Sequence, residues 1–118
     1  MAKQKFLPGE IPDHVMDGLL HMLQRISFGE AVLVAQDRVL VQVEWNEKIR
    51  MDCWEEHQEK VDWEEKTLVC LTEHIRQEFS RLQFGRLVIV VKRGRVIGLE
   101  RTEKQRFTGL DGEGIQKL

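Results

Sequence analysis

The spacing of apolar residues along the chain changes from a helical to an extended pattern, and it does so twice. Apolar residues recur every three or four positions over residues 15–26, which places them on one face of an α-helix. The apolar run at 31–35 and the segment at 39–45 have the composition of strands, and Asp37-Arg38 lies between them where a tight hairpin turn is expected. The same elements recur at 71–82, 87–91 and 95–101, with Arg93-Gly94 at the turn. The pattern therefore predicts a helix–strand–strand unit that occurs twice.

The two units are related by one constant offset. Adding 56 to residues 28–51 gives 84–107, and these segments align without a gap, with eight of the 24 pairs identical. Seven of the other 16 pairs are apolar in both copies, and an ungapped register of this kind indicates an internal repeat. The identical pairs are Phe28/Phe84, Gly29/Gly85, Val32/Val88, Val34/Val90, Glu44/Glu100, Glu47/Glu103, Lys48/Lys104 and Arg50/Arg106.

Two such units predict an α+β fold. Amphipathic helices have to cover apolar strands, so we expect two αββ repeats in a two-layer sandwich, with a four-stranded antiparallel sheet, both helices on one face and a pseudo-twofold axis between the repeats. We expect each helix to end at a Phe-Gly pair, where Gly29 or Gly85 closes it in the left-handed conformation. The predicted single domain, residues 1–118, consists of repeat 1 at about 13–51, an acidic connector at 52–69, repeat 2 at about 70–107 and a flexible tail at 108–118.

The first strand of each predicted hairpin is apolar on both faces, although a sheet with one solvated face should alternate. Something is therefore expected to cover the second face, either a second copy of the chain or the connector. We expect a homodimer on this ground, and another protein partner is possible. Trp54 and Trp63 in the connector are either anchors for such a partner or part of a lid over the uncovered face.

The segments Phe28-Gly29, Val39–Glu44 and Glu47–Arg50 resemble the YezD-like family of small bacterial proteins. The second copy resembles the family more closely, through Phe84-Gly85, Arg93–Val96 and Thr102–Arg106. The first copy departs from the family at its turn, where Asp37-Arg38 replaces the expected glycine. The resemblance covers both repeats but not 52–69 or the tail. It implies the architecture, supplies no activity, and implies that one unit normally self-associates and that this chain has fused two.

Charge is balanced over the whole chain but unevenly distributed. Eighteen basic and 20 acidic residues give a net charge of −2, which argues against a nucleic-acid binder that uses its whole surface. Residues 86–106 have a balance of +5, whereas 51–66 have −5. We favour an interaction of the basic second repeat with the acidic connector, within or between chains. The alternative is a small nucleic-acid or anion-binding regulator that uses Lys92, Arg93, Arg95, Lys104 and Arg106.

The repeated Glu-Lys-x-Arg segments are the most specific polar feature of the chain. In an extended segment Lys48 and Arg50 would project to the same side, as would Lys104 and Arg106 in the second copy. Such pairs could bind an anion or an acidic partner, and Arg93 and Arg95 at the second turn could contribute. The other interpretation, which we place first, is a charged edge strand that prevents sheet-to-sheet aggregation, or ion pairs between the repeats.

Two Cys-x-x-x-His pairs present the one arrangement that could hold a metal. On a helix, Cys53 with His57 and Cys70 with His74 would each offer two zinc ligands on one face. The spacing matches no familiar zinc finger, so we favour no metal and no other cofactor.

Several classes of protein are excluded by what the chain lacks. Its longest wholly apolar runs, 31–35 and 87–91, are far shorter than the roughly 20 residues of a membrane span. No apolar segment of a secretory signal follows the basic N-terminus, and two cysteines are too few for a disulfide scaffold, so we expect a cytoplasmic protein. Neither a nucleophile elbow nor a glycine-rich phosphate loop is present. We therefore expect a binding or assembly module rather than an enzyme.

Overall fold

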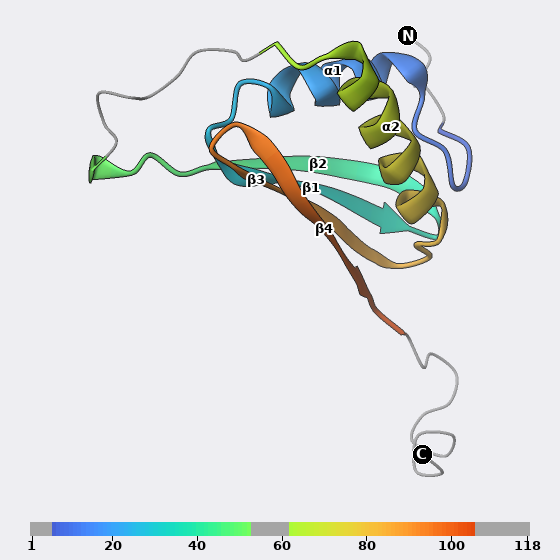
Figure 1. Cartoon of the computed structure of the whole chain (residues 1–118). Helices are drawn as coiled ribbons and strands as arrows, with labels where there is room; N and C mark the ends of the chain where they lie inside the picture. The colour runs from blue at the N-terminus through green and yellow to red at the C-terminus, as the bar shows by residue number, and fades with distance from the viewer. Residues whose placement is uncertain (1–5, 53–61, 106–118) are drawn as a thin grey trace, which may run out of the picture.

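The computed structural model describes residues 6–52 and 62–105. These residues form a four-stranded antiparallel sheet in the order β2-β1-β3-β4, with both helices on one face (Figure 1). The predicted α+β architecture of two αββ units is confirmed. The elements are α1 (Asp13–Leu23), β1 (Phe28–Gln36), β2 (Val39–Glu47), α2 (Glu65–Ser80), β3 (Gly85–Lys92) and β4 (Arg95–Glu103).

The expected pseudo-twofold axis passes through the centre of the sheet. β1 pairs with β3 so that Val32 lies opposite Val88, its own equivalent in the repeat. The hairpins are equivalent too, because β2 and β4 each carry one unpaired bulge residue at the same repeat position, Val41 and Ile97. Each hairpin turn also donates a backbone hydrogen bond to the other repeat, from Arg38 N to Gln83 O at 2.8 Å and from Gly94 N to Ser27 O at 3.0 Å. The two repeats are therefore joined into one sheet.

Both hairpins turn where the sequence predicts. The central residues of both turns have positive φ angles: 55° and 69° at Asp37 and Arg38, and 54° and 75° at Arg93 and Gly94. Two positive φ angles define a type I′ turn, whose twist matches that of the adjoining strands. Arg38 holds this conformation with a side chain, whereas Gly94 does so without one.

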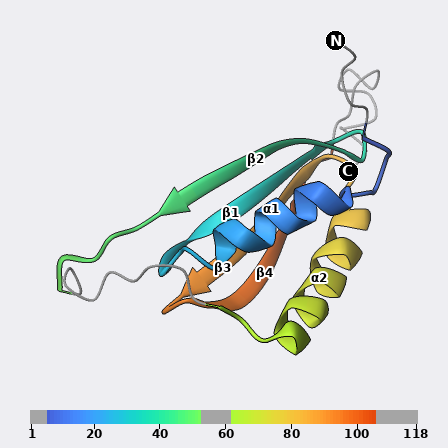
Figure 2. The same cartoon turned by 90° about the horizontal axis from the view of Figure 1, so that it is seen from above.

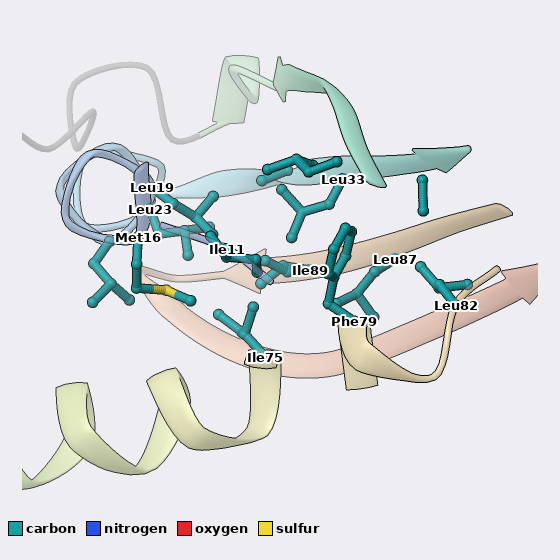
Figure 3. Packing of buried hydrophobic residues seen from close by; sticks show 14 of the residues in the cluster. Ile11, Met16, Leu19, Leu23, Leu33, Ile75, Phe79, Leu82, Leu87 and Ile89 are labelled. Atoms are coloured by element: carbon teal, nitrogen blue, oxygen red, sulfur yellow. The ribbon is translucent and has the colours of Figure 1, made fainter. Parts of the chain in front are cut away.

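The hydrophobic core lies between the helices and the sheet (Figure 3). Seen from above, α1 lies over the central strands and α2 diverges from it on the β4 side (Figure 2). Ile26 and Leu82 follow the ends of the helices and remain buried, at 4% and 0% exposure, which explains why the apolar helical spacing extends past both helix ends. The largest fully buried side chains are those of Ile11, Met16, Leu23, Leu33, Ile75, Phe79, Leu82, Leu87 and Ile89.

The Phe-Gly pairs lie at the starts of strands instead of the ends of helices, with Phe28 as the first residue of β1 and Phe84 directly before β3. α1 ends at Leu23, and both Gly29 and Gly85 pair within the sheet. A Cβ atom at Gly29 would lie 2.1 Å from the Asn46 carbonyl oxygen, and one at Gly85 would lie 2.0 Å from that of Thr102. The prediction that these glycines close the helices is wrong, because the close approach of the neighbouring strand is what requires glycine here.

α2 begins earlier than expected. It starts at Glu65, so residues 65–69, placed in the connector by the sequence, form its first turns. With the 56-residue offset, Pro12 of repeat 1 corresponds to Leu68 in the first turns of α2, and α1 starts only after this proline, at Asp13. In the part of the chain that the structure describes, neither helix is long and apolar enough to span a membrane.

Candidate functional site

The face of the sheet opposite the helices, here called the open face, is built by strands of both repeats. Successive side chains of a strand point to opposite faces. Ala31, Leu33, Leu87 and Ile89 belong to the core on the helix side, so the residues that alternate with them lie on the open face. Along β1 and β3 these are Glu30, Val32, Val34, Arg86, Val88, Val90 and Lys92.

Four valines form the centre of the open face. Val32 and Val88 pair across the pseudo-twofold axis, and Val34 and Val90 lie at equivalent positions on either side. Val32 is only 2% exposed although it is not part of the core beneath the helices, and the other three are partly buried. The edge strands flank this centre with polar residues, since Glu44 pairs with Val32 and Glu100 with Val88. The open face is therefore an apolar patch within a polar rim, as in many protein interfaces.

Glu30 and Arg86 are equivalent in the repeat but carry opposite charges. Each lies beside a valine of the other central strand, Glu30 opposite Val90 and Arg86 opposite Val34. Glu30 is only partly exposed, and no described residue forms an ion pair or side-chain hydrogen bond with its carboxylate. Arg86 lies 4.0 Å from Glu44, the limit of an ion pair. Glu30 and Arg86 thus place opposite charges at equivalent positions on the two sides of the axis, and Lys92 lies one row of side chains beyond Glu30.

Arg86 borders a hollow at one end of the open face. The hollow has a volume of about 330 Å³ and is lined by Val34, Glu44, Arg86 and Lys104, among others. The Glu44 carboxylate already accepts a hydrogen bond of 2.7 Å from Gln42. Two cationic side chains therefore lie around a space large enough for an incoming carboxylate.

A row of cations crosses the opposite end of the sheet. Lys48 N donates to Phe28 O at 2.7 Å, Phe28 pairs with Lys92, and Lys92 pairs with Arg95, so these four residues lie side by side on successive strands. We call Lys48, Lys92 and Arg95 the basic row. All three are exposed, and no described residue forms an ion pair with them. The Arg50 guanidinium lies 5.5 Å from the centroid of the Phe28 ring, within cation–π range.

The predicted cationic residues are divided between the two ends of the sheet. Arg93 lies in the β3–β4 turn beside the basic row. Lys104 lies at the other end, where its N–H donates to Phe84 O at 2.7 Å. Arg50 is paired with Asp52 through contacts of 3.1 and 3.2 Å, and Arg106 lies outside the described residues. The set predicted for an anion or nucleic acid therefore does not form one patch.

Trp63 lies on the helix side of the sheet and does not cover the open face. Its backbone N–H donates to Gln24 Oε1 at 2.9 Å, and its indole Nε1 donates to Gly94 O at 3.0 Å. The ring packs against the core between the end of α1 and the β3–β4 turn. Trp54, the other tryptophan proposed as an anchor or lid, lies outside the described residues.

Cys70 and His74 do lie together on α2. The Cys70 Sγ is 3.6 Å from His74 Nδ1, which is also 2.9 Å from the Cys70 carbonyl oxygen. Both residues line a groove of about 740 Å³ between α2 and the β3–β4 hairpin. Cys53 and His57 lie outside the described residues, and no cluster of three potential metal ligands occurs within 6–52 and 62–105. The structure therefore brings together one of the two predicted pairs.

The residues that define the open face are not evident from local sequence patterns. The segment 31–35 is apolar throughout, and neither Glu30 nor Arg86 belongs to a recognisable motif. The repeat alignment contains the signal, because these two residues occupy equivalent positions with opposite charges. Gln24 was missed for a different reason, since its role depends on Trp63, 39 residues later in the chain.

Comparison with known proteins agrees with the duplicated architecture. A family model described as "Uncharacterized small protein (DUF2292)" matches the chain twice, at residues 15–51 and 71–107. No curated protein and no solved structure matches the chain. Since the two matches together span more than half of its length, the chain belongs to the DUF2292 family of uncharacterized small proteins, as a tandem duplication of the family's unit.

Proposed function

We propose that this protein is a non-enzymatic binding and assembly module of the cytoplasm that self-associates through the open face. The observation that carries the proposal is the valine centre, Val32, Val34, Val88 and Val90, on the side of the sheet without helices. Apolar patches surrounded by polar residues are typical of protein interaction sites. The resemblance to the YezD-like family is consistent with this proposal, because it implies that a single αββ unit normally self-associates.

The test is sedimentation velocity of the full chain and of a Val88→Lys variant over a range of concentrations. A lysine at the centre of the face would bury an uncompensated charge in the dimer, so we expect the wild type to associate and the variant to remain monomeric. Glu73→Lys, on the exposed side of α2, is the control and should associate like the wild type. A wild type that remains monomeric throughout would contradict the proposal.

The basic row favours a second candidate function, the binding of a polyanion such as single-stranded nucleic acid. Lys48, Lys92 and Arg95 lie side by side around Phe28, which gives cations for phosphates and one aromatic ring for stacking. We place this function second because the row is short and only one aromatic residue, Phe28, lies within it on the described strands.

Fluorescence anisotropy with a labelled single-stranded oligonucleotide distinguishes the two candidates. If the row binds phosphates, the affinity should fall steeply with salt, and replacing both Arg93 and Arg95 by Glu should abolish binding. Lys104→Glu, at the other end of the sheet, is the control and should retain most of the affinity. Equal losses in the two variants would indicate non-specific charge attraction and would exclude the basic row as a site.

A further inference from the structure

We infer that the partner on the open face is a second copy of this chain, oriented so that Glu30 of each copy lies against Arg86 of the other. This inference rests on the proposed function and adds to it the orientation of the two copies. It follows from the one pair of equivalent residues on the central strands that carries opposite charges. Glu30 and Arg86 are equivalent in position, on opposite sides of the axis between Val32 and Val88.

The geometry follows from that placement. Two copies can meet face to face about a twofold axis that lies between the two sheets and is perpendicular to the line from Glu30 to Arg86. This rotation places each Glu30 over an Arg86 of the other copy. The valine centres of the two copies then lie opposite each other, since they surround the midpoint of that line. A self-complementary interface of this type is the one that a twofold dimer requires.

The surroundings of Arg86 fit an incoming carboxylate. Arg86 and Lys104 both line the hollow of about 330 Å³, so Glu30 of a second copy would meet two cations there, beside one carboxylate, Glu44, that already accepts from Gln42. The Arg86 side chain is 45% exposed, and its contact with Glu44 is long, at 4.0 Å. Its guanidinium N–H groups are therefore available to another acceptor. Glu30 itself is partly buried and has no ion-pair partner among the described residues. Each copy thus provides the group that the other lacks.

The size of the face predicts a dimer of moderate affinity. Four strands about 4.8 Å apart and about five rows of side chains 6.8 Å apart give roughly 500 Å² on each copy. The total of about 1,000 Å² is at the lower end of specific interfaces, so association should be followed up to several hundred micromolar.

Charge reversal and its restoration test this orientation. We would measure the dimer dissociation constant by sedimentation equilibrium for the wild type, Glu30→Arg, Arg86→Glu and the double variant with both changes. Each single change places like charges together at both ends of the interface, so we expect association to weaken by at least about tenfold. The double variant exchanges the two charges and should return to within about threefold of the wild type. Glu73→Arg on α2 and Arg25→Glu after α1 are matched controls, because both are exposed and lie outside the open face.

The outcomes separate this inference from the proposed function. If the double variant stays as weak as the single variants while Val88→Lys abolishes association, the open face is the interface but the pairing of Glu30 with Arg86 is overturned. If the wild type is monomeric at every concentration, both proposals are overturned, as they are if another segment of the chain proves to cover the valines. Thermal unfolding of each variant shows whether the fold is retained. Recovery of dimerisation in the double variant shows independently that neither substitution disrupts the fold.

Discussion

At the level of single residues, two glycines determine how closely each hairpin can pair. A Cβ atom at Gly85 would lie 2.0 Å from a backbone oxygen of β4, and one at Gly29 would lie 2.1 Å from a backbone oxygen of β2. A backbone atom of a paired strand cannot move aside as a side chain can. Both glycines are therefore required by close packing between strands, at equivalent positions in the two repeats.

Replacing Gly85 by alanine should lower the free energy of unfolding by about 3 kcal/mol, because β3 and β4 would have to separate around the new methyl group. Gly98→Ala in β4 is the matched control, since no atom lies within 4 Å of a Cβ at that position. It should leave stability unchanged or raise it by about 0.5 kcal/mol. Urea unfolding of both variants provides the measurement, and equal stabilities would show that the close approach is not what requires glycine.

The first hairpin turn contains residues poorly suited to its conformation. Asp37 and Arg38 both adopt positive φ angles, which residues with side chains rarely do. Changing them to Asn-Gly, the preferred pair for a type I′ turn, should raise the free energy of unfolding by about 1 kcal/mol. The backbone hydrogen bond from Gly9 N to Arg38 O does not depend on the side chain and should persist. A thermal melt measures the effect. A lower Tm would mean that the Arg38 side chain contributes more to stability than the relief of backbone strain returns.

At the level of elements, Gln24 and Trp63 connect parts of the fold that are distant in the sequence. Gln24 is 8% exposed at the end of α1, donates to Leu20 O at 3.2 Å and accepts from Trp63 N. Trp63 in turn donates to Gly94 in the β3–β4 turn. Because Trp63 precedes α2, these bonds fix where the second helix enters the fold. An ion pair of 3.2 Å between Arg101 and Glu78 then holds α2 against β4.

Gln24→Leu should lower the free energy of unfolding by about 1 to 3 kcal/mol, because it leaves the half-buried Trp63 N–H without its acceptor. Gln77→Leu on the exposed side of α2 is the control and should change stability by less than about 0.5 kcal/mol. Denaturant unfolding monitored by tryptophan fluorescence follows both variants. A loss no greater than that of the control would show that water satisfies Trp63 in the absence of Gln24.

The elements that could be predicted from the sequence are those encoded by local periodicity and by the repeat. The 56-residue offset that aligns Phe28 with Phe84 predicts the αββ order, the turns and the symmetry of the sheet. The helix ends could not be predicted in the same way, because Ile26 and Leu82 continue the apolar spacing after the helices have stopped. The start of α2 and the position of Trp63 depend on tertiary contacts that no local pattern encodes.

The candidate site was predicted only in outline. The apolar content of the central strands indicates that a second face needs a cover, but the sequence does not reveal how the cations are arranged. Only the register shows that Lys48, Lys92 and Arg95 form one row and that Lys104 lies at the other end. Likewise, the opposite charges of Glu30 and Arg86 acquire meaning only when the axis between them is known.

At the level of the whole molecule, duplication produces one sheet with two different faces. The helices of both repeats cover one face, while the valines of both repeats meet at the centre of the other. Equivalent residues lie symmetrically about one axis, so a difference between the repeats becomes a directional feature of the surface. The central claim of this account is that a second copy covers the open face.

Methyl NMR of the full chain at increasing concentration tests that claim most directly. The methyl signals of Val34, Val88 and Val90, which are partly exposed in the single chain, should shift as the dimer forms because a second copy replaces water beside them. The signal of Val32, which is already 2% exposed, should shift with them because its neighbours in the valine centre gain new contacts. Val69, which is 52% exposed on α2, and Leu33, which is buried on the helix side, should not shift. Signals of the four valines that do not depend on concentration, or shifts confined to Val69, would contradict the account.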